Sequence, residues 1–269
     1  MAENSTIEWT DHTFNPWEGC QKVGPGCDHC YAEARNARFG GGTAPNWGPH
    51  AERRLTSLSN WRKPRQWQAA AARFLAEYGR RQRVFCASLA DVFDNAVDPM
   101  WRAALADVIL ETPHLDWLLL TKRVGNALDM LWSMFGADIP PNVFIGATIV
   151  NQDEWDRDVG KIARVAVLIG KARVFLSMEP LLSSVDFERG NYRFAGIVGW
   201  VIAGGESGKG ARPAHPDWFR RLRDQCASAA VPFLFKQRAS GLGTMIAIAP
   251  ILIGANAVTS TAPRPAGAG

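Results

Sequence analysis

The chain has 269 residues, of which 47% are hydrophobic and 21% charged, and its formal net charge is +4. This composition is typical of a soluble globular protein with a substantial core, and the small excess of base permits an anionic partner without requiring one. The first twelve residues lack the basic and apolar regions of a secretory leader, and no segment offers the roughly 20 apolar residues of a membrane span. We therefore expect a cytoplasmic protein with no membrane partner.

Buried strands alternate with helices along most of the chain. The sequence predicts strands at 13–17, 84–90, 116–121, 142–148, 172–177, 199–203 and 232–237. It predicts helices that begin at Pro99 and that span 125–135, 154–169 and 216–229. Continuous apolar strands between helices indicate a parallel sheet covered on both faces. We expect an α/β fold over residues 1–237, a partial or complete TIM-like (β/α) barrel with mostly parallel strands.

Polar residues follow the predicted strands at the points where the strands end. Barrel enzymes place their chemistry on these loops. The candidates for binding a cofactor or substrate are Ser88, Asp91, Lys122, Arg123, Asn151, Glu179, Gly204, Gly205 and Glu206. A helix N-cap explains Ser88 and Asp91 equally well.

Residues 40–68 interrupt this alternation, and we expect an inserted basic and aromatic loop there. Interleaved bases and tryptophans suit nucleic-acid contact through phosphate pairing and stacking. The residues that would make this contact are Arg53, Arg54, Trp61, Arg62, Lys63 and Arg65. A solvated basic face with tryptophans packed inward explains the same pattern, and it is the interpretation that we favour.

The last stretch, 238–269, is rich in Ala, Gly, Thr and Pro, and its only charged residues are Arg238 and Arg264. It lacks the rhythm of strands and helices. We expect an atypical tail that is disordered or that results from a shifted reading frame.

The five cysteines are Cys20, Cys27, Cys30, Cys86 and Cys226. The first three fall within eleven residues of a loop rich in Gly and Pro, which lets the chain fold back so that their sulfurs converge. Either they hold three irons of a [4Fe–4S] cluster, or they hold zinc together with a histidine, which would be His29, His12 or His50. A zinc site normally brings a second pair of ligands further along the chain, and none appears. The other two cysteines are expected in the core.

The cysteine loop, GCQKVGPGCDHCYAE, resembles that of a family first named from bacteriophage proteins, the gp-thirty-seven/gp-sixty-eight-like family. The resemblance continues through residues 5–17, 88–94, 120–123, 177–182 and 204–237. That family is similar to radical SAM enzymes, in which three cysteines hold the cluster after the first barrel strand. Their common loop has three residues between the first two cysteines, whereas this chain has six.

This resemblance implies a radical-SAM-type enzyme of phage or prophage origin, with a [4Fe–4S] cluster on Cys20, Cys27 and Cys30 and with S-adenosylmethionine (SAM). An electron donor would reduce the cluster, and reductive cleavage of SAM would give a deoxyadenosyl radical that acts on an unknown substrate, with nucleic acid among the candidates. The alternative is a zinc-stabilised nucleic-acid-binding protein without catalysis.

The resemblance also implies roles for the other loops. Ser88 or Asp91 would receive the amino group of SAM, and Lys122 with Arg123 would clamp its carboxylate or a substrate phosphate. Roles near the ribose and adenine of SAM would fall to Asn151, Glu179 and the 199–206 segment with Gly204, Gly205 and Glu206.

Overall fold

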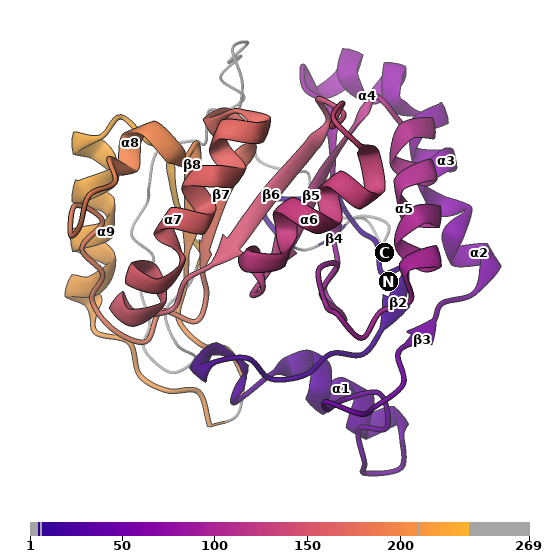
Figure 1. Cartoon of the computed structure of the whole chain (residues 1–269), viewed down its shortest axis with the longest axis horizontal. Helices are drawn as coiled ribbons and strands as arrows, with labels where there is room; N and C mark the ends of the chain where they lie inside the picture. The colour runs from indigo at the N-terminus through magenta and orange to yellow at the C-terminus, as the bar shows by residue number, and fades with distance from the viewer. Residues whose placement is uncertain (1–4, 6, 209, 237–269) are drawn as a thin grey trace.

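A seven-stranded sheet forms the centre of the computed structural model, which describes residues 5, 7–208 and 210–236 (Figure 1). Its strands, in the order in which they pair, are β1 (His12–Thr13), β4 (Gln82–Cys86), β5 (Leu115–Thr121), β6 (Val143–Thr148), β7 (Val174–Met178), β8 (Trp200–Ala203) and β9 (Phe233–Phe235). All neighbours are parallel, and their order in the sheet repeats their order in the chain. Each connection therefore moves one strand along, and the sheet curls into half a barrel. The expected partial (β/α) barrel is confirmed.

The expected first strand at 13–17 is wrong in one respect, because it is two short strands in different sheets. His12–Thr13 joins the barrel beside β4, whereas β2 (Trp17–Glu18) pairs antiparallel with β3 (Arg54–Leu55). The chain therefore leaves the barrel before it reaches the cysteines.

The helices are α1 (Tyr31–Phe39), α2 (Leu58–Trp61), α3 (Lys63–Ala69), α4 (Ala71–Tyr78), α5 (Pro99–Glu111), α6 (Val124–Phe135), α7 (Gln152–Ile169), α8 (Phe194–Ile197) and α9 (Pro216–Ser228). Local sequence explains where two of the long helices begin. The side chain of Asp98 caps α5 with Pro99 in its first turn, and the side chain of Asn151 caps α7. None of the helices in the described ranges is long and apolar enough to cross a membrane. The tail expected at 238–269 lies outside these ranges.

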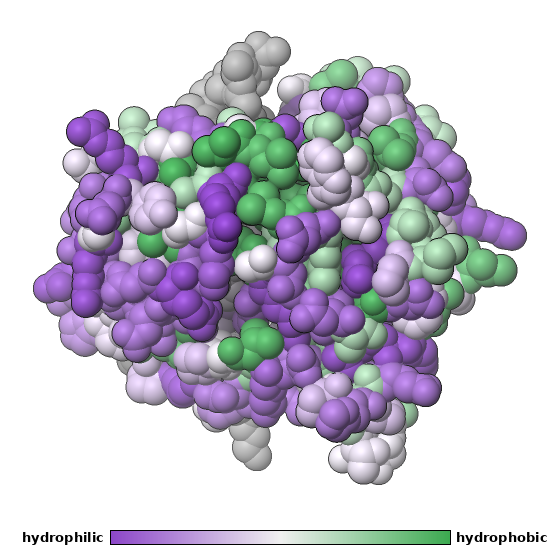
Figure 2. Space-filling view, in the orientation of Figure 1, coloured by the Kyte–Doolittle hydropathy of each residue, from purple (hydrophilic) through white to green (hydrophobic). Residues whose placement is uncertain are grey.

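Most of these helices cover the outer face of the sheet, whereas α1 and the cysteine loop lie below it in Figure 1, where the strands end. The same view in Figure 2 shows a surface covered mainly by hydrophilic residues, with hydrophobic ones gathered near the top. This is the pattern of helices that turn an apolar stripe inward.

The inserted loop expected at 40–68 is corrected by the structure, because residues 58–69 are mostly helical. Trp67 on α3 is buried and stacks on His12, with ring centroids 4.2 Å apart. Trp61 on α2 packs edge-on against Phe14. Each tryptophan therefore packs inward from its own helix, against the segment that carries β1.

Side chains of the strands alternate between the helix-covered face and the inside of the half-barrel. Phe85, Leu118, Phe175, Trp200 and Ile202 point inward and, together with Trp9, form a buried cluster that we call the aromatic floor. A Cβ on Gly146 would lie 2.2 Å from the ring of Phe175, so the glycine makes room for that ring. The floor packs the inside of the half-barrel, and polar groups gather at the carboxyl ends of the strands. Cys86 and Cys226 lie in the outer core, as expected.

Candidate functional site: a pocket lined by three cysteines

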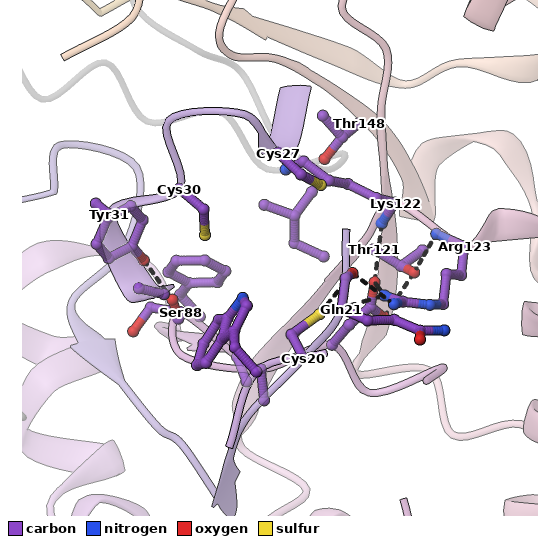
Figure 3. A pocket seen from close by; sticks show the side chains of 17 residues that line it. Cys20, Gln21, Cys27, Cys30, Tyr31, Ser88, Thr121, Lys122, Arg123 and Thr148 are labelled. Atoms are coloured by element: carbon purple, nitrogen blue, oxygen red, sulfur yellow. Dashed lines mark hydrogen bonds and ion pairs between the residues drawn. The ribbon is translucent and has the colours of Figure 1, made fainter. Parts of the chain in front are cut away.

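A pocket of about 120 Å³ opens at the carboxyl ends of β4, β5 and β6. The sulfurs of Cys20, Cys27 and Cys30 all point into it (Figure 3). Its other lining residues are Gln21, Tyr31, Ala32, Trp47, Phe85, Ala87, Ser88, Ala90, Asp91, Leu120, Thr121, Lys122, Arg123 and Thr148. Three cysteines that the sequence places in one loop therefore share one space with the ends of three barrel strands.

The three cysteines occupy different backbone contexts. Cys20 follows β2, Cys27 ends a 3₁₀ turn (Pro25–Cys27), and Cys30 is the N-cap residue of α1. The α-helix that follows begins only at Tyr31. The two intervening residues let the sulfurs of Cys27 and Cys30 turn toward the same cavity.

Glycines let the cysteine loop approach the barrel closely. A Cβ on Gly24 would lie 2.6 Å from Oε1 of Glu154, and one on Gly26 would lie 2.8 Å from Cγ1 of Val150. The Glu154 carboxylate is itself held, since it accepts a hydrogen bond of 3.0 Å from the amide of Val150. Larger residues would therefore lift the loop away from β6 and α7.

The Cys20 end of the loop is held by a buried charge network. Nη1 of Arg123 donates to Sγ of Cys20 at 3.4 Å and to Asp91 at 3.1 Å, while Nη2 donates to the carbonyl of Gln21 at 2.9 Å. Asp91 also accepts from the Thr121 hydroxyl at 2.7 Å and from the amide of Lys122 at 3.1 Å. Asp91 therefore ties the loop after β4 to the end of β5.

Burial and the charge of Asp91 raise the pKa of the Cys20 thiol to about 11, although Arg123 acts in the opposite direction. Burial alone would lower the pKa of Arg123, but Asp91, Cys20 and Asp94 outweigh it and raise that pKa above its ordinary value. Arg123 is therefore a permanent cation beside this sulfur.

The Cys27–Cys30 end is held from the loop after β8. Arg212 binds both carboxylate oxygens of the buried Glu206, at 3.0 and 2.6 Å, and also reaches Asp28 at 3.0 Å and the carbonyl of Pro25 at 2.9 Å. Nδ1 of His29 lies 2.9 Å from the same Glu206. Burial acts to raise the pKa of Glu206, but the bonds from Arg212 and His29 outweigh it and lower that pKa to about 2.

The structure separates the candidates predicted from sequence into two groups. Ser88, Asp91, Lys122 and Arg123 line the pocket with the cysteines. The remaining candidates, Asn151, Glu179, Gly204, Gly205 and Glu206, are not among its lining residues. Asn151 accepts a hydrogen bond of 2.9 Å from the amide of Glu154 as the cap of α7, so its side chain serves the helix.

Glu179 lies beyond the pocket in an ion pair with Lys236, with Oε1 and Nζ 3.2 Å apart. Gly204 directly follows β8 and makes this pair possible, because a Cβ there would lie 2.6 Å from the same oxygen. Gly204 therefore has a packing role, and Gly205 is buried beside it.

Sequence reasoning missed several residues of the site, among them Thr148, Tyr31 and Arg212. Thr148 ends β6, and its buried hydroxyl faces the pocket with no hydrogen-bond partner among the described residues (Figure 3). Tyr31 donates its hydroxyl to the carbonyl of Ser88. The position of Thr148 at the end of a predicted strand was a usable signal, but nothing in the sequence paired Arg212 with Glu206.

The basic segment turns several of its charges toward the protein itself. Arg53 was a candidate for nucleic-acid contact, and this is corrected: its side chain is 1% exposed and pairs with the buried Asp94 at 2.8 Å. Arg54 pairs with Glu18, and Arg65 pairs with Glu111. The indole of Trp61 donates to the carbonyl of Pro16. For the exposed Arg62 and the half-buried Lys63, nucleic-acid contact stays a prediction.

No group of three or more His, Cys, Asp or Glu side chains in the described ranges is spaced to hold a single metal ion. Each iron of a cluster takes its own thiolate, so a cluster needs its three sulfurs further apart than one ion does. Of the histidines that could complete a zinc site, His29 contacts Glu206 and His12 stacks on Trp67.

Comparison with known proteins gives a family and a distant likeness of fold. The model of a family described as "Protein of unknown function (DUF5131)" matches residues 4–247. A cysteine-to-serine mutant of spore photoproduct lyase is similar in structure, with 12% identity, a TM-score of 0.49, and coverage of 87% of this chain and 78% of that one. A double mutant of the same enzyme, with bound AdoMet and a dinucleoside spore photoproduct, has 12% identity, a TM-score of 0.43, and coverage of 82% and 62%. None of the curated proteins matches the sequence.

Proposed function

The chain belongs to the DUF5131 family, and we propose that it is an iron–sulfur enzyme of the radical SAM type. In this proposal Cys20, Cys27 and Cys30 hold three irons of a [4Fe–4S] cluster and leave the fourth iron open for SAM. When bound, the cluster and SAM supply reductive cleavage of SAM to a deoxyadenosyl radical. Phage origin and the identity of the substrate stay predictions.

The observation that carries this proposal is the meeting of three sulfurs in one pocket at the carboxyl ends of barrel strands. Parallel barrels place their reactive groups at this end, because the loops there come from every strand. The donor set is also suitable, since three soft thiolates suit iron–sulfur chemistry.

The chain's own residues supply the rest of a cofactor site. Phe85 of the aromatic floor and Leu120, which packs against that floor, line the pocket and give it an apolar wall that limits water near a reactive group. The ammonium of Lys122 lines the pocket and has no hydrogen bond or ion pair within the described ranges, so it is available for an anionic group such as a carboxylate. The free hydroxyl of Thr148 offers a donor and an acceptor on the neighbouring strand.

The test is to purify and reconstitute the full chain without oxygen and to count metals. We expect about four irons per chain and brown protein. Alanine at Cys20, Cys27 or Cys30 should each remove most of the iron. Cys226→Ala is the matched control, because Cys226 is buried in the outer core, away from the pocket. This variant should keep the iron content of the wild type. Colourless protein with one zinc per chain would favour the zinc-stabilised alternative.

Use of SAM is tested on the same samples. Protein with a reduced cluster should release deoxyadenosine from SAM, and the three cysteine variants should not. If the wild-type chain holds four irons but neither binds nor cleaves SAM, the proposed cluster stands and the proposed radical SAM activity is refuted.

A further inference from the structure

Arg123 is committed to the cysteine loop, which changes the role expected from sequence. The anion clamp predicted for Lys122 and Arg123 needs two free cations. The Arg123 side chain is only 8% exposed, and its donors point at Sγ of Cys20, at Asp91 and at the carbonyl of Gln21. Only Lys122 is left to bind an external anion.

We propose that Arg123 sets the reduction potential of the cluster through its hydrogen bond to Cys20. This inference rests on the proposed function, because it requires the cluster. A reduced cluster carries one more negative charge than an oxidised one, so a cation and a hydrogen bond at a ligand sulfur stabilise the reduced form and raise the potential. Burial strengthens the effect, since little water screens a guanidinium that is 8% exposed.

The hydrogen bond singles out one of the three ligands. No side chain in the described ranges donates a hydrogen bond to the sulfur of Cys27 or Cys30, so Cys20 is the ligand whose sulfur Arg123 can influence directly. The thiol of Cys20 can also donate to the carbonyl of Gln21 at 3.6 Å, a bond that is lost when the sulfur binds iron as a thiolate. The contact with Arg123 suits the thiolate.

Asp91 has two opposed effects on the same site. It holds the guanidinium in place at 3.1 Å, and its own negative charge acts on the cluster in the opposite sense. Substitutions at Arg123 and at Asp91 should therefore move the potential in opposite directions. A purely structural role would loosen the loop in both variants and could not produce opposite signs.

The experiment is a redox titration of the reconstituted full chain, followed by the EPR signal of the reduced cluster. Arg123→Gln keeps a donor and loses the charge, and we expect its potential to fall by at least about 59 mV, a tenfold change in the one-electron equilibrium. Arg123→Lys keeps the charge but lacks the planar guanidinium, and its reduction potential should fall by less. Asp91→Asn should raise the potential. Arg220→Gln, on the exposed face of α9, is the control and should not move it.

An unchanged or raised potential in Arg123→Gln would overturn the proposal, and so would shifts of the same sign in Arg123→Gln and Asp91→Asn. If Arg123→Gln does not retain iron, Arg123→Lys decides: a lowered potential supports the proposal and an unchanged one overturns it. Failure of the proposed function is a different result, namely a wild-type chain that binds no iron.

Discussion

The two ends of the cysteine loop are held by different means. At the Cys20 end, a buried arginine touches the sulfur itself, and the surrounding carboxylates, Asp91 and Asp94, are almost fully buried. At the Cys27–Cys30 end, Arg212 binds the backbone and the intervening Asp28 but neither sulfur, and 28% of its side chain is exposed. The first support can alter the chemistry of a ligand, whereas the second positions the loop.

This difference extends to the backbone of Cys20. Its amide donates to the carbonyl of Asn46, and its carbonyl accepts from the amide of Gly48. The buried Arg53 donates hydrogen bonds to the backbone carbonyls of these two residues, Asn46 and Gly48. Arg53 therefore supports Cys20 indirectly, through Asn46 and Gly48, and its ion pair with Asp94 helps to fix the backbone around the site.

The largest effect is expected from Arg53→Ala. Removing Arg53 takes away the close partner of the buried Asp94 carboxylate and leaves it only the more distant Arg123, at 3.9 Å, which should lower the free energy of unfolding by roughly 3–5 kcal/mol. Urea denaturation measures it. Arg62→Ala, an exposed arginine of the same segment, should change stability by less than about 0.5 kcal/mol. Equal effects at the two positions would contradict the buried role of Arg53.

A smaller loss is expected from Arg212→Ala. It removes hydrogen bonds between charged groups at a partly exposed site, for a loss of about 1.5–3 kcal/mol. The variant should lose iron faster than the wild type in the presence of a chelator. The reduction potential of the clusters that remain should equal that of the wild type. Arg220→Ala, in a surface pair with Asp217, serves as the control. A potential that moved as far as in Arg123→Gln would remove the distinction between the two ends.

The smallest effect is the dependence of stability on pH at Glu206. Its pKa is about 2 in the folded chain, below the ordinary 4.5, so its contribution is complete above pH 4.5 and is lost as the pH falls toward 2. In chelator-treated protein, Glu206→Gln should be less stable than the wild type at pH 6, and the two should converge by about pH 2. Urea midpoints at pH 6, 4 and 3 measure this, and a constant gap between the two proteins would refute it.

Much of the fold could be predicted from the sequence because its signals are local. Apolar runs such as 116–121 and 142–148 marked strands, and Pro99 marked the beginning of a helix, since burial on both faces and a fixed φ constrain those residues whatever surrounds them. The helices between 58 and 69 were missed because Pro64 and the dense charges hid an inward-facing pair of tryptophans.

The candidate site divides in the same way. The sequence by itself determined that three cysteines in a Gly/Pro-rich loop would converge after a first strand, because spacing and backbone freedom are local properties. Only the tertiary structure decided what surrounds them. Asn151 caps its own helix, which is a local contact. In contrast, Arg123 faces a sulfur rather than a ligand, and Arg212 reaches back to the cysteine loop, because those partners lie 103 and 187 residues away along the chain and are brought near only by the curl of the sheet.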